Sequence, residues 1–259
     1  MVSFNNIIGH EEIIRHLQNA MKTGKVSHAY LLSGEDGSGK MMIAKAVAKA
    51  LLCEHKDGCG ECAACKQVDS LNHPDVIYIT HEKYEIRVDD IRKGINETID
   101  IKPYSGDYKI YIIDDADRMN AGAQNALLKT LEEPPAYAVI LLLTNNKDRL
   151  LDTILSRCVS MTLGSVRESE IEDYLKANTG ASHADIAFAA AFSLGNIGRA
   201  LHVLDTEEFK DMLNDTMNVI THMKSMEIYE VVSYAKSLTK YKNEIYDSLI
   251  SLWYGIEIC

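Results

Sequence analysis

The sequence lacks any long apolar run and any sign of a targeting segment. No stretch of its 259 residues reaches the roughly 18 consecutive apolar residues that a membrane-spanning helix needs. Residues 1–12 contain no basic segment followed by a long apolar stretch, which argues against a secretory signal. We therefore expect a cytoplasmic protein with no membrane partner.

Positive charge is also scarce. The chain carries 27 Lys and Arg residues against 38 Asp and Glu residues, a formal net charge of −11. An acidic surface repels phosphate backbones, so we expect no broad nucleic-acid clamp on this chain, although a local basic patch is compatible with the total charge. The 46% hydrophobic content is ordinary for a globular protein, and the length suits two or three small domains.

Short apolar segments alternate with helical patterns as far as residue 163. Strands are predicted over 29–33, 76–80, 109–114, 138–144 and 159–163, with helices over 11–22, 40–52, 89–99 and 119–133. This alternation predicts an α/β fold with a parallel five-stranded sheet and helices on both faces.

The pattern becomes all-helical after Leu163. Ser165 and Glu168 have the spacing of a capping box that opens one helix, and Ser182 precedes a second. From about residue 206 the sequence is helical in pattern and rich in Met and Tyr. No internal repeat or low-complexity linker separates these parts.

A phosphate-binding loop is predicted at Gly34–Lys40, between a strand and a helix. The segment fits G-x-x-x-x-G-K, in which Gly34, Gly37, Ser38 and Gly39 allow backbone N–H groups to converge on phosphate oxygens. Lys40 would reach the β- and γ-phosphates. The alternative is a plain glycine turn, which the surrounding strand and helix disfavour.

The residue after the loop departs from the motif. A Ser or Thr hydroxyl normally binds Mg²⁺ there, and this chain has Met41, whose thioether is a poor ligand for a hard cation. The loop is thus predicted to hold ATP, ADP or only a phosphate, with magnesium binding and efficient hydrolysis disfavoured.

Acidic residues follow the predicted strand 109–114. Asp114 stands where a carboxylate usually holds the magnesium shell, and Asp115 where a base usually orients the attacking water. Glutamate is commoner at the second position, so the shorter Asp115 is a weak base candidate. The alternative is a solvated acidic loop.

Four cysteines predict a structural metal site. Cys53, Cys59, Cys62 and Cys65 can close a tetrahedral thiolate shell around Zn²⁺, and Gly58 and Gly60 permit tight turns between them. Disulfides are the competing interpretation, which a reducing cytoplasm disfavours.

Ser156-Arg157-Cys158 precedes the fifth predicted strand. An arginine at the edge of a nucleotide-binding domain can reach a neighbouring subunit's site and stabilise charge on its γ-phosphate. A lone surface arginine is usually only solvated or ion-paired, so this role depends on the surrounding motifs.

Together these motifs resemble the bacterial DNA polymerase III clamp-loader family, of the AAA+ class. The resemblance covers residues 5–200 and is carried, in order along the chain, by Ile8–His10, His28–Leu32, the phosphate loop, the four cysteines, Asp114–Asp117, Asn125–Pro135 and Ser156–Cys158. It implies an AAA+ core at 1–164 with a zinc module at about 53–65, a helical lid at 165–205, and the start of a helical collar at 206–259.

The family contains two kinds of subunit with this pattern, the ATP-hydrolysing motor gamma/tau and the delta-prime subunit. Met41, Asp115 and the segment Asn72–Asp75 favour delta-prime. The resemblance then implies a stator that offers Arg157 in trans to a neighbour's ATP, has no polymerase chemistry, and has weak or absent ATPase activity of its own.

The resemblance also implies further site residues and partners. Thr144 and Asn145 would form the sensor-1 turn, and Arg199 of the segment Gly195–Arg199 would face the phosphates as sensor 2. The implied partners are motor and delta subunits in a hetero-oligomeric ring, and through that ring the sliding clamp and primed DNA.

Overall fold

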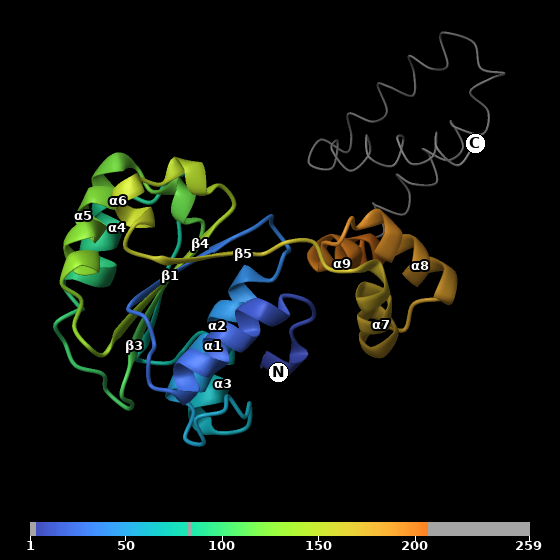
Figure 1. The fold of residues 1–259 in the computed structure, drawn as a ribbon, viewed down its shortest axis with the longest axis horizontal. Coiled ribbons are helices and arrows are strands. Elements are labelled where there is room, and N and C mark those ends of the chain that lie inside the picture. Colours follow the sequence, from blue (N-terminus) through green and yellow to red (C-terminus); the bar gives the residue numbers. More distant parts are fainter. Residues whose placement is uncertain (1–3, 82–83, 207–259) are drawn as a thin grey trace, which may run out of the picture. The chain divides into compact units, whose positions relative to one another are not determined.

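The computed structural model describes residues 4–81 and 84–206 (Figure 1). Its contacts divide the chain into two compact units, with the division after Glu170. The predicted collar at 206–259 lies outside the described residues except for Thr206. The boundaries at residues 164 and 205 therefore stay predictions.

The first unit contains alternating strands and helices. Its strands are β1 (Ala29–Ser33), β2 (Val76–Ile79), β3 (Lys109–Ile113), β4 (Ala138–Thr144) and β5 (Val159–Thr162). Its α-helices are α1 (Glu11–Lys22), α2 (Lys40–Leu52), α3 (Ala63–Asp69), α4 (Val88–Ile91), α5 (Ala121–Glu132) and α6 (Asp152–Leu155). The remaining helical segments are the 3₁₀ turns η1 (Phe4–Asn6), η3 (Ala116–Arg118) and η4 (Lys147–Arg149) and the π-helical segment η2 (Arg92–Asn96).

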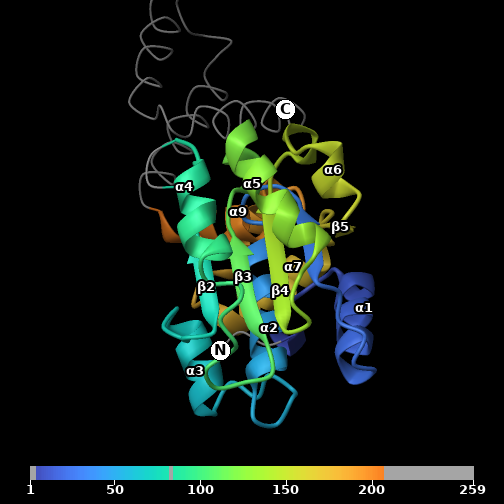
Figure 2. The ribbon, with the colours of Figure 1, turned by 90° about the vertical axis from the view of Figure 1, so that its left-hand side faces the viewer.

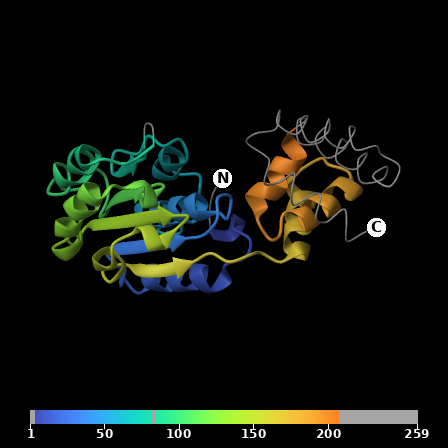
Figure 3. The ribbon, with the colours of Figure 1, turned by 90° about the horizontal axis from the view of Figure 1, so that it is seen from above.

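The strands form one parallel sheet in the order β2-β3-β4-β1-β5. Ser33 of β1 lies beside Thr144 of β4 on one side and Thr162 of β5 on the other. Figure 3 shows β1 in blue between green β4 and yellow β5. The predicted parallel five-stranded sheet is confirmed, and its order brings the ends of β1, β3 and β4 to one edge.

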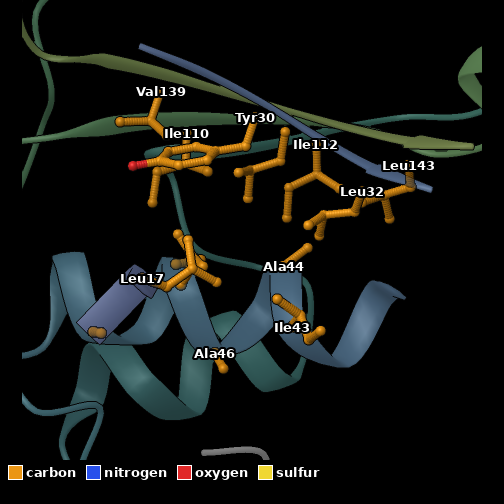
Figure 4. Close-up of a cluster of buried hydrophobic side chains, with 14 of the residues drawn as sticks. Leu17, Tyr30, Leu32, Ile43, Ala44, Ala46, Ile110, Ile112, Val139 and Leu143 are labelled. Carbon is orange, nitrogen blue, oxygen red and sulfur yellow. The ribbon is translucent and has the colours of Figure 1, made fainter. Parts of the chain in front are cut away.

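Helices cover both faces of the sheet, as predicted. Figure 2 shows α4 and α5 in front of β2, β3 and β4, with α2 behind them. Alternate strand residues enter the two cores: Leu32 faces α1 and α2, whereas Leu31 faces α4 and α5. Figure 4 shows Tyr30 pointing from the sheet toward Leu17 of α1, and Ile112 pointing toward Ala44 of α2. Because both faces are buried, the strands are nearly continuous apolar runs.

Two helices have other bounds than the sequence predicts. Of the helix predicted over 89–99, only α4 (Val88–Ile91) is α-helical, and the following residues Arg92–Asn96 form a π-helical turn. Gly94 in this turn approaches β2 so closely that an added Cβ would lie 3.1 Å from Ile79. The helix predicted from residue 119 starts at Ala121, because the Asn120 side chain accepts a capping bond from the Ala123 N–H at 2.9 Å.

The second unit contains α8 (His183–Phe192) and α9 (Ile197–Asp205), and α7 (Glu168–Asn178) runs into it across the division. Ser182 caps α8 by accepting from the Asp185 N–H, which confirms the helix predicted after it. The capping box predicted at Ser165 is wrong. The first residue of α7 is Glu168, and Glu170 accepts from the Arg167 N–H instead.

None of the helices within residues 4–81 and 84–206 combines the length and the apolar character that crossing a bilayer requires.

Candidate functional site

The phosphate loop lies at the carboxyl edge of the sheet, between β1 and α2. The Gly34 N–H donates to the Thr144 carbonyl of β4 at 3.1 Å, which fixes the start of the loop. Gly37 and Gly39 have φ values of +80° and +95°, which glycine adopts without strain. The N-terminus of α2 follows at once, and its first N–H groups have no partner within the helix. The loop thus has the construction of an anion site.

Lys40 is folded back onto this loop. Its Nζ donates to the Gly34 and Glu35 carbonyls, each at 2.8 Å, and to Asn145 Oδ1 at 2.6 Å. Burial lowers the pKa of Lys40, and the neighbouring carboxylates, Asp36 foremost, act in the opposite direction. An ammonium has three N–H donors, so a phosphate would have to replace one of these contacts.

Position 41, which usually supplies the side-chain ligand for magnesium, has no side-chain oxygen. Met41 packs against the apolar cluster between the sheet and helices α1 and α2. The nearest loop hydroxyl, Ser38 Oγ, is buried and has no hydrogen-bond partner among the described residues. The loop retains the geometry for phosphate, while the side chain at position 41 serves packing.

Asp114 and Asp115 follow β3 at the same edge of the sheet. Burial and the adjacent Asp115 raise the pKa of Asp114. Asp115 has φ +50°, and its Oδ2 lies 3.3 Å from His81 Nε2 and 3.5 Å from Arg118 Nε. The carboxylate at the predicted base position is therefore held beside basic groups of its own chain.

Asp117 connects this acidic segment to β4. Its Oδ1 accepts from Thr144 Oγ1 at 2.9 Å and from the Asn145 N–H at 3.1 Å. The Asn145 amide donates to Asp36 Oδ1 at 2.8 Å while its oxygen accepts from Lys40. The structure therefore brings the phosphate loop, Asn145 and the acidic segment together, as the sequence predicts.

The four cysteines gather into one cluster between α2 and α3. The sulfur atoms of Cys53, Cys59, Cys62 and Cys65 all lie within 4.8 Å of one another. Gly58 and Gly60 have φ values of +71° and +78°, so the tight turns predicted at these glycines are present. The arrangement can hold a metal ion.

Backbone N–H groups surround these sulfurs as they do in metal–thiolate sites. Cys59 Sγ lies 3.4 Å from the N–H groups of Glu61 and Cys62, and Cys62 Sγ lies 3.5 Å from that of Cys65. Burial raises the pKa of Cys65, whereas at Cys53 hydrogen bonds outweigh burial and lower the pKa to about 6. Crowded thiolates repel one another, so a bound cation is what allows all four to ionise together.

An ion pair with one buried partner links this cysteine module to the core. Lys49 of α2 is fully buried and donates to Asp69 at the end of α3, whose side chain is 30% exposed. Removing Asp69 would leave the Lys49 ammonium buried without this carboxylate, so the pair helps to position α3 against α2.

Arg157 lies between α6 and β5, and its polar partners come from the helices rather than from the phosphate loop. Its Nη2 donates to Glu132 Oε1 of α5 at 2.7 Å, and its Nη1 donates to the Thr153 carbonyl of α6 at 2.8 Å. The side chain is 34% exposed. The guanidinium is thus held at the surface of its unit.

Arg199 belongs to the second unit, at the start of α9. Asn196 caps this helix by accepting from the Arg199 N–H at 3.1 Å, and Arg199 Nη1 donates to the Ser193 carbonyl at 3.4 Å. Its predicted contact with phosphates stays a prediction.

A polar cavity of about 320 Å³ lies next to the phosphate loop. Its wall includes Gly9, His10, Thr162 and Arg167, and His10 Nε2 donates to the Ser38 carbonyl at 3.3 Å. This volume is at the lower end of the range for small-molecule sites.

The family model described as "DNA polymerase III, delta subunit" matches residues 9–167, more than half of the chain. The chain belongs to the clamp-loader subunits of DNA polymerase III. The matched residues run from Gly9, shortly before α1, to Arg167, the residue before α7, and so include every predicted site residue except Arg199.

Curated relatives include both kinds of clamp-loader subunit. The subunit delta' of Bacillus subtilis is 31% identical over 226 residues, 86% of this chain and 65% of the relative. The subunit tau/gamma of Haemophilus influenzae is 40% identical over 176 residues, 67% of this chain and 25% of the relative. The tau subunit of Bacillus subtilis is 44% identical over 158 residues, 60% of this chain and 28% of the relative. The chain thus spans less than two thirds of the length of these relatives.

Solved structures show the same fold. A gamma subunit-related protein from Thermotoga maritima aligns over 87% of this clamp-loader chain and 78% of its own, with TM-score 0.50 and 22% identity. The RuvB Holliday junction branch migration motor of the same organism covers 92% of this chain and 85% of its own, with TM-score 0.58 and 16% identity. Both likenesses concern the fold alone.

Gln124 is a well-connected residue of this clamp-loader subunit that the sequence did not single out. Its buried amide nitrogen donates to the carbonyls of Met119 and Arg149, and its oxygen accepts from the Leu151 N–H. These hydrogen bonds connect α5 to Arg149 and Leu151, which lie just before α6. The available signal is its spacing: Gln124 lies three residues before Leu127 and seven before Leu131, on the apolar face of the helix, where an amide needs hydrogen-bond partners.

We expect Gln124→Met, which keeps the volume but removes these bonds, to lower the free energy of unfolding by about 2–4 kcal/mol, because buried backbone groups lose their partners. Urea unfolding would measure the change. Gln67→Met, on the exposed side of α3, is the control, with a change within about 0.5 kcal/mol. Equal stability of the two variants would contradict a structural role for the Gln124 amide.

Proposed function

We propose that this chain is a delta-prime-type stator of the DNA polymerase III clamp loader. It offers Arg157 to the ATP bound by an adjacent motor subunit and hydrolyses little or no ATP itself. Its partners are gamma/tau-type motor and delta subunits in a hetero-oligomeric ring, which acts on the sliding clamp and primed DNA in the cytoplasm. Residues 165–205 form the helical lid domain, and residues from 206 begin the collar.

The observation that carries this proposal is the absence of an oxygen ligand after the phosphate loop. Met41 packs into the apolar cluster, so the loop cannot place the usual hydroxyl on Mg²⁺. Asp115, at the base position, lies beside His81 and Arg118. Arg157, by contrast, is partly exposed at the surface. The chain thus has a weakened site of its own and an arginine available to another.

The resident metal that we propose is zinc. Zinc favours tetrahedral thiolate shells, and four protein sulfurs leave no open position for a reacting water. The ion would therefore hold the segment between α2 and α3 rather than take part in catalysis.

The second candidate is a gamma/tau-like motor that binds and hydrolyses Mg-ATP. It is favoured by sequence identity, which is 40% and 44% with the tau/gamma and tau relatives against 31% with delta'. It also fits the retained Lys40 and Asn145. This candidate requires that magnesium bind without a hydroxyl at position 41.

Calorimetric titration of the purified chain with ATP distinguishes the two candidates. For the stator we expect magnesium to change the ATP dissociation constant by no more than about twofold, because position 41 offers no oxygen. Met41→Thr is the matched control, and restoring the hydroxyl should make binding magnesium-dependent. Wild-type binding that magnesium tightens about tenfold or more would contradict the stator and support the motor.

A further inference from the structure

The guanidinium of Arg157 is held by groups from two helices. Nη2 donates to Glu132 Oε1, whereas Nη1 donates to the Thr153 carbonyl and lies 3.4 Å from Ser156 Oγ. Thr153 and Ser156 are close to Arg157 in sequence, four residues and one residue away. Glu132 lies 25 residues away on α5 and is the contact that ties the guanidinium to a separate element.

We propose that Glu132 is a positioning residue that holds Arg157 for its action on a neighbour's nucleoside triphosphate. This inference rests on the trans role of Arg157 proposed above. Without the Glu132 carboxylate, the long arginine side chain samples many rotamers, and restricting it to one rotamer when it contacts the triphosphate costs conformational entropy. When the Glu132 carboxylate accepts from Nη2, the planar guanidinium is held in one orientation, and its remaining N–H donors point in defined directions.

The placement of Glu132 suits this role. It is the last residue of α5. Glu133 and then Pro134 and Pro135 follow, and a residue before proline is disfavoured in the helical conformation, so the helix ends here. The Glu132 side chain is 52% exposed, so the pair lies on the surface, where an ion pair adds little to stability. We therefore expect the ion pair to act mainly on the position of the guanidinium at the reacting phosphate. A displacement of about 1 Å there can lower the rate about a hundredfold.

The test measures ATP turnover by a clamp loader reconstituted from this chain with motor and delta subunits, in the presence of clamp and primed DNA. The difference in turnover between wild-type and Arg157→Ala loaders defines the Arg157-dependent turnover. We expect Glu132→Ala to retain about a tenth of it or less, with an unchanged KM for ATP. Glu132→Gln, whose amide oxygen can accept the same bond, should retain at least about half.

Three controls separate positioning from a structural role. Glu133→Ala removes the same charge one residue away and should retain full turnover, since the hydrogen bond to Arg157 comes from Glu132. The thermal unfolding midpoint of the Glu132→Ala chain should match wild type, and the double variant with Arg157→Ala should equal Arg157→Ala alone.

The outcomes are distinct for the two proposals. Wild-type turnover with Glu132→Ala, while Arg157→Ala is slow, would overturn the positioning role and leave the trans arginine intact. No difference between wild-type and Arg157→Ala loaders would overturn both. Glu132→Gln as slow as Glu132→Ala would overturn a role through the hydrogen bond.

Discussion

Replacing Cys59 by Ser is expected to abolish stoichiometric zinc binding and to unfold the segment between α2 and α3. The four sulfurs lie within 4.8 Å of one another, so the loss of one leaves an incomplete tetrahedral shell. Binding energy at structural zinc sites is also folding energy, on the order of 10 kcal/mol in small zinc peptides. Metal analysis of the reduced protein should fall from one equivalent of zinc to well under one, and resistance of residues 53–69 to proteolysis should fall with it.

The matched control is Cys158→Ser, which changes a cysteine outside the cluster. Burial raises the pKa of Cys158 to about 12, which keeps it a neutral thiol. This variant should retain one equivalent of zinc. A wild-type protein without zinc, or a Cys59→Ser variant that keeps a full equivalent, would contradict the metal site. Acidification should release the ion, because protons compete with it for the thiolates.

If Arg157 acts in trans as proposed, replacing it by Ala is expected to slow ATP hydrolysis at the adjacent motor site by about 10³-fold, because an arginine in trans stabilises charge on the transferring phosphoryl group. That factor corresponds to about 4 kcal/mol of transition-state stabilisation. Total ATP turnover of the assembled loader should fall by the fraction that the adjacent motor site contributes. The fold of the chain should persist, since an exposed ion pair contributes at most about 1 kcal/mol.

Arg157→Lys is the matched control for charge. Lysine keeps the positive charge but lacks the planar guanidinium, whose two terminal nitrogens donate to Glu132 and to the Thr153 carbonyl. We expect it to restore only a small part of the lost turnover. Full restoration would show that charge alone suffices at this position.

Local sequence patterns were sufficient to predict the sheet and the residues that gather around the phosphate loop. Apolar runs fix β1, β3 and β4, and a parallel sheet must bring their carboxyl ends to one edge, so the proximity of Lys40, Asp114 and Asn145 follows from topology. The cysteine spacing likewise predicts the cluster, because its members lie within one short segment.

Contacts between side chains that are distant in sequence could not be predicted in the same way. The bonds of Gln124 to Arg149 and Leu151 span at least 25 residues, and nothing in a single sequence indicates which buried backbone groups need a partner. The same holds for Glu132 and Arg157. The end of α4 was missed for a different reason, because the close approach of Gly94 to Ile79 depends on packing rather than on periodicity.

The proposed trans role of Arg157 is tested most directly by steady-state ATP turnover of the loader reconstituted with the wild-type chain or with Arg157→Ala, at saturating ATP with clamp and primed DNA present. Equal assembly of the two loaders, checked by gel filtration, ensures that turnover reports chemistry. We predict that the Arg157→Ala loader assembles normally but loses the ATP turnover of the adjacent motor site. Normal assembly with turnover equal to wild type would contradict that role.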